Sequence, residues 1–518
     1  MNTYTSYRHL PALAGICSMA EAAKPGLSVE ECVRRLKRYH YAFKRLHQIF
    51  TARITAEPIY ELKMGFSLHA HLCAEHTATL RKRVGEMREP PLGLEAVPDA
   101  NLEVLFDEIL GAPTTEELIL GLYGKALPAL RAALELHLQE TNALADHPSV
   151  RLCRFALLEL EDMLKFGAQS IAALVDDACR QSVGDWLLLL DDCLAAAGGL
   201  DGCQTPPHEP HLETNGPLSL SLSPSEGERV PKAGEGAVHG CKAGTPSGNS
   251  LPAANRRQHS AKPYQYDGVP KRDERFPDPY NMGVNAEVFL YDEQFPPEPK
   301  TLMMFYKRLR EVDVPEMMAS IITETPGKPW DYYRDMTRQL WDEARHAMMG
   351  EVGFADLGIE WPKHVMVNYT WSLALNTQLK PIERHAVLYF IEQGLMPKTG
   401  KRFEWEVGLA SHNPLSALFQ DYDWADEVLH ARIGRDWYLK HFGNPQEGVR
   451  YGDECWSRVL LNWENWRQQG LTQHRNWWPD LYREACRRWG TEPDPKVLAY
   501  STTYQTVRAD LKELTGSA

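Results

Sequence analysis

The chain has 518 residues, of which 43% are hydrophobic, and its formal net charge is −14. This length predicts two or three domains with ordinary hydrophobic cores. The negative charge argues against nucleic acid as the main partner, because phosphate binding needs clustered Lys and Arg. No apolar stretch reaches the length of a membrane span.

The ten cysteines are scattered and form no Cys-x-x-Cys pair. Such a distribution is typical of free thiols in a reducing compartment rather than of a disulfide framework or a zinc site. The first residues also lack the charged segment and sustained apolar run of a secretory signal. We therefore expect a cytoplasmic protein with neither a membrane nor a nucleic-acid partner.

Residues 1–197 are predicted to form one domain, with helical patterning almost throughout residues 28–195. Four long segments with short connections predict a helical bundle. The predicted helices cover residues 28–55, 58–88, 114–144 and 148–175, with one more near 184–197. The bundle is structural or docks a partner, or else it is a degenerate copy of a metal-binding bundle. The second reading relies on Glu159–Asp162, where Asp replaces the His of a Glu-x-x-His pair, and on His71 and Glu75, which share a helix face.

Residues 198–262 are rich in Gly, Pro, Ser and polar residues. Such a segment cannot bury enough apolar surface to order itself, so we predict a flexible, disordered linker. The His and Cys residues within it match no metal-binding template.

The third segment, residues 263–440, contains a nine-residue phrase that occurs twice. Residues 342–350 and 426–434 both read Asp-Glu-x-x-His-Ala-x-(Met/Ile)-Gly. On a helix, positions i and i+3 lie on one face, so the Glu carboxylate and the His imidazole converge. One such pair from each of two helices, plus one Glu from each of two others, is how four-helix bundles hold two transition-metal ions.

The residues around the two pairs have helix-face spacing. The first stripe is Leu340, Glu343, Ala347, Gly350 and Phe354, and the second is Trp424, Glu427, Ala431, Gly434 and Tyr438. These offsets are typical of faces turned toward a core. A carboxylate there is costly unless a cation compensates it, which favours a metal ion over the alternative of buried ion pairs with nearby Arg.

Two further carboxylates are needed, one from each of two more helices. The helix predicted over 314–324 offers Glu316, with Glu311 and Glu324 as alternatives, and Glu316 also suits the capping box that begins at Asp313. The helix predicted over 365–392 offers Glu383, with Glu392 as its substitute. Pro381 leaves open a broken or newly started helix ahead of Glu383.

With this order of ligands, residues 300–440 resemble the ferritin-like di-metal carboxylate superfamily. The resemblance rests on Glu316, Glu343, His346, Glu383, Glu427 and His430. It implies an up-down four-helix bundle that holds two Fe, two Mn or a mixed pair per chain. In that superfamily such centres activate dioxygen, oxidise iron for storage or scavenge peroxide.

Asp342 and Asp426, each directly before a repeated Glu, are expected to accept hydrogen bonds from the ligand imidazoles. We assign no catalytic residue beyond the ligands. The chain has no glycine-rich nucleotide motif, so electrons for an oxygenase cycle would come from an external donor, the substrate or the metal. The substrate is expected to be a small organic molecule.

Residues 441–518 continue as helical sequence with six Trp between 456 and 489. We interpret them as a helical cap on the bundle, with a substrate lid or a homodimer surface as alternatives. The whole chain is thus predicted to be all-α, with two four-helix bundles, a linker and a Trp-rich extension. The expected function is a di-metal oxidoreductase; the alternative is a non-catalytic ferritin-like scaffold.

Overall fold

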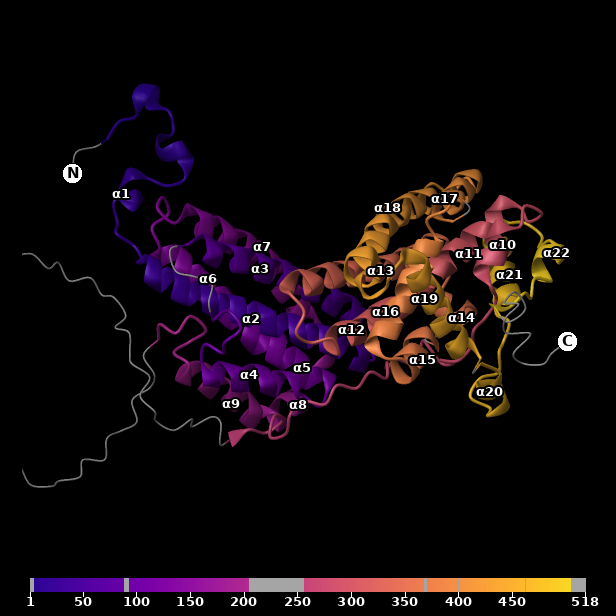
Figure 1. Cartoon of the computed structure of the whole chain (residues 1–518), viewed down its shortest axis with the longest axis horizontal. Coiled ribbons are helices and arrows are strands. Elements are labelled where there is room, and N and C mark those ends of the chain that lie inside the picture. The colour runs from indigo at the N-terminus through magenta and orange to yellow at the C-terminus, as the bar shows by residue number, and fades with distance from the viewer. Residues whose placement is uncertain are drawn as a thin grey trace, which may run out of the picture.

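A computed structural model describes residues 4–87, 93–204, 256–367, 370–398, 400–461 and 463–504. All regular elements within these ranges are helices, and they include no strand, so the all-α prediction is confirmed for them. None of the described helices is long and apolar enough to cross a lipid bilayer. The molecule is elongated, with the indigo and magenta N-terminal helices at one end and the orange and yellow C-terminal helices at the other (Figure 1).

The N-terminal half contains all the predicted helices. The predicted helix over 114–144 is divided by a short π-helix, and the helices α1, α4 and α8 were not predicted. The elements are α1 (Met19–Ala22), α2 (Val29–Ala56), α3 (Tyr60–Glu86), α4 (Ala100–Leu110), α5 (Thr115–Gly121), the π-helix η3 (Leu122–Ala126), α6 (Leu127–Glu140), α7 (His147–Leu174), α8 (Asp177–Ser182) and α9 (Gly184–Ala196).

The C-terminal half places the two repeated phrases on its two longest helices, α13 and α18. The elements up to α18 are α10 (Ala286–Tyr291), α11 (Pro297–Arg310), α12 (Asp313–Thr323), α13 (Trp330–Asp356), α14 (Trp361–His364), α15 (Thr370–Gln378), α16 (Pro381–Gly394), α17 (Lys401–Ala410) and α18 (Pro414–Trp437). The helix predicted over 365–392 is two helices, because Pro381 begins a new one.

The Trp-rich residues form four more helices that pack on the preceding ones. Helix α19 lies along α16, and the Trp456 and Trp371 rings pack with centroids 4.2 Å apart. Trp477 and Trp478 are buried. These helices are α19 (Pro445–Leu460), α20 (Trp463–Gln468), α21 (Trp478–Trp489) and α22 (Pro495–Leu498).

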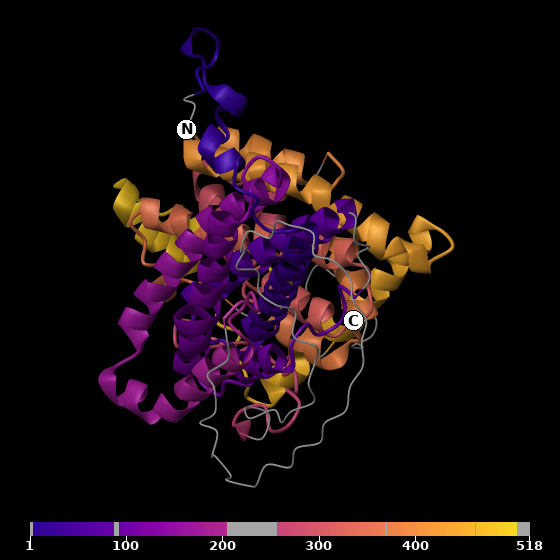
Figure 2. The same cartoon turned by 90° about the vertical axis from the view of Figure 1, so that its left-hand side faces the viewer.

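The two halves share one core. Helix α3 packs along α13 and α2 packs against α12, and one continuous hydrophobic cluster includes Leu36 and Phe66 as well as Met336 and Trp456. Figure 2 views this junction from the N-terminal end, with the N-terminal helices in front of the orange ones. Beside the predicted linker, the two halves are thus joined by an extensive packed interface.

The predicted linker is described only at its ends, since residues 205–255 lie outside the described ranges. Both ends are held by the N-terminal helices. The Arg38 guanidinium donates to the carbonyls of Ala197, Gly199 and Leu200. The Glu108 carboxylate accepts backbone N–H groups of residues 258–260.

Candidate metal centre

The repeated phrases meet across the contact between α13 and α18. Glu343 and His346 face Glu427 and His430, and all four side chains are buried. Glu311, at the turn between α11 and α12, approaches from a third side. Helix α16 supplies Glu392 from a fourth.

One group of ligand atoms surrounds the His430 imidazole. Its Nδ1 atom lies 3.1 Å from Glu343 Oε1, 3.8 Å from Glu392 Oε1 and 3.7 Å from Glu427 Oε2. Ligands that share an ion at about 2.1 Å are about 3 to 3.5 Å apart. This group is therefore close to the dimensions of a metal site.

A second group surrounds the His346 imidazole. Its Nδ1 atom lies 3.4 Å from Glu311 Oε2, 3.6 Å from Glu343 Oε2 and 3.4 Å from Asp423 Oδ1. The Glu343 carboxylate thus presents one oxygen to each group, and the two imidazole rings lie 6.0 Å apart. Two neighbouring groups that share one carboxylate match the plan of a dinuclear centre.

The two aspartates connect the repeats crosswise. His346 Nε2 on α13 lies 3.1 Å from Asp426 on α18, and His430 Nε2 on α18 lies 3.4 Å from Asp342 on α13. Donation of each Nε2–H to a carboxylate leaves each Nδ1 free as a ligand atom. Both aspartates therefore lie beside the imidazole nitrogens for which they were predicted as acceptors.

The glycine that closes each phrase permits close helix packing. A Cβ atom on Gly350 would lie 2.2 Å from the backbone nitrogen of Leu309 on α11, and one on Gly434 would lie 2.3 Å from the Tyr389 ring on α16. Only hydrogen fits at these two contacts. The glycines bring α11 close to α13 and α16 close to α18, and those neighbours carry the remaining carboxylates.

Glu316 is placed away from this centre. Its carboxylate binds Lys63 Nζ at 2.5 Å, Arg272 at 2.8 Å and the Ser372 hydroxyl at 2.6 Å. It is neither a ligand of the cluster nor the predicted helix cap. Glu311 lies at the end of α11 and Glu316 lies within α12, so the turn between the two helices points them in different directions. Glu311 therefore takes the place that was predicted for Glu316.

Glu383 is likewise outside the cluster. It lies in the first turn of α16, where it accepts the Lys380 N–H at 2.8 Å and binds Arg458 at 2.9 Å. It is a helix-capping residue. Glu392 lies two and a half turns further along, so its side chain points to the opposite side and meets His430. Glu324, the other alternative, pairs with Arg384.

Three charged residues at the centre were not predicted. Asp423 lies one turn before Glu427, and this spacing on the same face is a signal that could have identified it. Lys401 Nζ lies 2.9 Å from Glu427 Oε1 and 2.8 Å from Asp423, and Arg308 binds both Glu311 and Asp423. Nothing in the sequence distinguishes these two cations from others.

The ionisation of the centre is strongly perturbed. Burial lowers the pKa of His346, but the neighbouring carboxylates of Asp426, Glu311 and Glu343 outweigh burial and raise that pKa to about 10. His430 behaves in the same way, with its pKa well above the usual value. Burial and the neighbouring Glu427 hold the pKa of Glu392 well above its ordinary range. These shifts favour the protonated forms of both imidazoles and of Glu392 in the metal-free cluster.

The donor set fits a pair of transition-metal ions. Five buried ligand atoms have no hydrogen-bond partner: Glu311 Oε2, His346 Nδ1, Glu392 Oε2, Glu427 Oε2 and His430 Nδ1. Such atoms are costly unless something satisfies them. Mixed carboxylate and imidazole ligands suit Fe, Mn or Zn.

The His and Glu residues considered for a degenerate second metal site in the N-terminal half form other contacts. His76 pairs with Glu159 at 2.6 Å, and His69 hydrogen-bonds the Tyr123 hydroxyl at 2.7 Å. His71 and Glu75 lie near the cations of α13, among them Arg338. Within the described ranges these four residues join no group with metal-ligand geometry.

Comparisons with protein-family models, with curated proteins and with solved structures found no match to this chain.

Proposed function

We propose that the chain is a ferritin-like di-metal oxidoreductase. Two Fe or Mn ions would be held by Glu311, Glu343, His346, Glu392, Glu427 and His430, with Asp423 as a further carboxylate. The observation that carries this proposal is the pair of imidazole Nδ1 atoms, each facing one oxygen of the shared Glu343 carboxylate. When bound, such ions supply the redox chemistry that activates dioxygen or peroxide.

The protein's own residues would orient these ligands and limit access by water. Asp342 and Asp426 hold the imidazole rings, and Gln339 donates to Glu392 at 3.0 Å. Lys401 binds one oxygen of Glu427 and leaves the other toward His430. The ligand side chains are buried, apart from the partly exposed Glu311, which keeps the centre away from bulk solvent.

The test is metal analysis of the protein purified without a tag, before and after anaerobic loading with Fe²⁺. About two Fe or Mn per chain are expected, with loss in the Glu343→Ala/Glu427→Ala double variant. Glu383→Gln is the matched control, because it removes a carboxylate outside the cluster and should keep the metals. Loaded protein should consume dioxygen. A loaded content near zero would overturn the proposal.

A second candidate is a non-catalytic ferritin-like scaffold, and the cations inside the cluster favour it. Arg308 and Lys401 are buried against the carboxylates that a metal would need. Together with the two protonated imidazoles they can neutralise the centre without metal. The scaffold predicts no metal uptake and no loss of stability when a chelator is added.

A further inference from the structure

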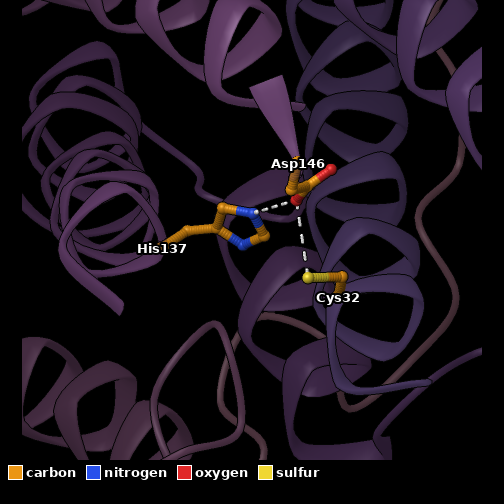
Figure 3. A group of neighbouring side chains, drawn as sticks. All are labelled: Cys32, His137 and Asp146. Carbon is orange, nitrogen blue, oxygen red and sulfur yellow. Dashed lines mark hydrogen bonds and ion pairs between the residues drawn. The ribbon is translucent and has the colours of Figure 1, made fainter. Parts of the chain in front are cut away.

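A second candidate site lies in the N-terminal half, at the far end of α2 from the junction. Cys32 stands in the first turn of α2, His137 in the last turn of α6, and Asp146 directly before α7. Figure 3 shows the three side chains converging, with the Asp146 carboxylate between the thiol and the imidazole. Cys32 is 114 positions from Asp146 in the sequence, so the fold brings it to the connection between α6 and α7.

The distances match those of a shared tetrahedral ion. Cys32 Sγ lies 3.5 Å and His137 Nε2 lies 3.6 Å from the same oxygen, Asp146 Oδ2, and the three atoms are within 4.8 Å of one another. With zinc–ligand bonds of about 2.3 Å to sulfur and about 2.0 Å to nitrogen or oxygen, tetrahedral edges are about 3.5 and 3.3 Å. Both distances agree within a few tenths of an ångström.

A fourth ligand is available. The Thr141 hydroxyl lies 3.2 Å from Asp146 Oδ2 and 3.9 Å from Cys32 Sγ. The other oxygen of Asp146 is held by Arg83 at 2.9 Å, as is typical of carboxylate ligands.

An independent observation is the state of His137. Its ring is completely buried and neither nitrogen forms a hydrogen bond, although Nε2 lies within ion-pair distance of Asp146 Oδ2, at 3.6 Å. A buried imidazole without a hydrogen bond is unfavourable. The alternative, a purely hydrogen-bonded Cys–Thr–Asp network, leaves Nδ1 of His137 without a partner and Nε2 with this long contact alone.

We propose that Cys32, His137 and Asp146, with the Thr141 hydroxyl, form a zinc site distinct from the di-metal centre. A thiolate and a carboxylate neutralise Zn²⁺, and the thiol proton is released to solvent on binding. Sulfur ligation favours zinc over the Fe or Mn of the carboxylate centre. The ion would join α2 to α6 and to the start of α7, and so stabilise this half of the molecule.

Cobalt provides the test, because only thiolate ligation gives Co²⁺ an intense near-ultraviolet charge-transfer band. We would titrate Co²⁺ into the full chain carrying Glu343→Ala/Glu427→Ala, so that the carboxylate centre does not contribute. The expected result is about one Co²⁺ per chain with that band, displaced by one equivalent of Zn²⁺. Absence of the band in this folded protein would overturn the proposal without any further variant.

Variants then identify the thiol. Cys32→Ser should abolish the band, whereas Cys193→Ser, another buried cysteine, should keep it. A band that survives in folded Cys32→Ser would also overturn the proposal. If Cys32→Ser fails to fold, His137→Gln is used instead and should weaken Co²⁺ binding at least about tenfold; unchanged binding would contradict the site.

Discussion

At the residue scale, the crossed aspartates are the clearest part of the candidate centre. Asp342 and Asp426 each hold the imidazole of the opposite helix. We expect Asp426→Asn to weaken metal binding about 10- to 100-fold, because the ring of His346 loses its charged acceptor. The measurement is competition with a chromophoric chelator. Asp436→Asn, on the exposed side of α18, is the control, and equal effects of both variants would contradict the assignment.

Metal affinity should rise with pH. Without metal, the raised pKa of both imidazoles and of Glu392 favours their protonated forms. Metal ions must displace these protons. We expect protons to be released on loading, measured in weakly buffered solution, with the affinity increasing between pH 6 and 8. Proton release near zero would show that the ligands are already deprotonated.

Above neutral pH, the stability of the metal-free protein should fall as the pH rises, whereas the metal affinity increases. The raised pKa of His346, about 10 against 6.5, stabilises the fold fully below pH 6.5 and progressively less as the pH approaches 10. Burial raises the pKa of Glu311, but Arg308 and His346 outweigh burial and lower it to about 2. The ionised carboxylate therefore adds stability above pH 4.5, and this stability is lost as the pH falls toward 2. Thermal unfolding in chelator should therefore show these two contributions together between pH 4.5 and 6.5. A melting temperature that rises from pH 7 to 9 would contradict this sign.

At the element scale, the two phrase-ending glycines set the distances between helices. Gly350→Ala places a methyl group against the backbone of α11, which cannot move away as a side chain can. We expect a loss of about 3 kcal/mol in the free energy of unfolding, measured with denaturant.

The matched control is Gly85→Ala. Gly85 lies near the end of α3, and a Cβ there meets nothing within 4 Å. Alanine should leave stability unchanged or raise it by up to about 1 kcal/mol. If Gly350→Ala and Gly85→Ala changed the free energy of unfolding equally, the close approach of α11 to α13 would not explain why position 350 is a glycine.

At the scale of the whole molecule, the two halves are joined by a buried ion pair as well as by apolar packing. Lys63 of α3 and Glu316 of α12 are almost completely inaccessible, at 1% and 0%. Removing one member leaves a buried charge with fewer partners. Lys63→Met should cost about 3 kcal/mol, whereas Lys363→Met, which breaks an exposed pair with Glu360, should have no measurable effect.

Hydrogen exchange would show whether the halves act as one unit. Because α3 and α13 share a core, we expect Lys63→Met to reduce amide protection in both helices together. Loss of protection in α3 alone would instead indicate two halves that unfold separately.

The sequence by itself determined the helical class, the approximate bounds of the long helices α2, α3 and α7, and the helix faces of the two repeated phrases. The spacing within each phrase is a local property of the sequence, because Glu, His and Gly at these fixed offsets must share one face of the helix that they form. It could not determine which carboxylates complete the cluster. Glu311 and Glu392, not Glu316 and Glu383, face the imidazoles because the turn after α11 and the helix start at Pro381 set the rotation of each helix.

Only the tertiary structure decided the rest. Lys401 and Arg308 reach the centre, and Cys32 meets His137 and Asp146, through helix contacts between residues far apart in sequence. The same holds for the shared core of the two halves, which apolar periodicity alone does not distinguish from two separate cores. A helix pattern specifies which face is apolar, but the neighbour that covers this face is chosen by packing over the whole chain.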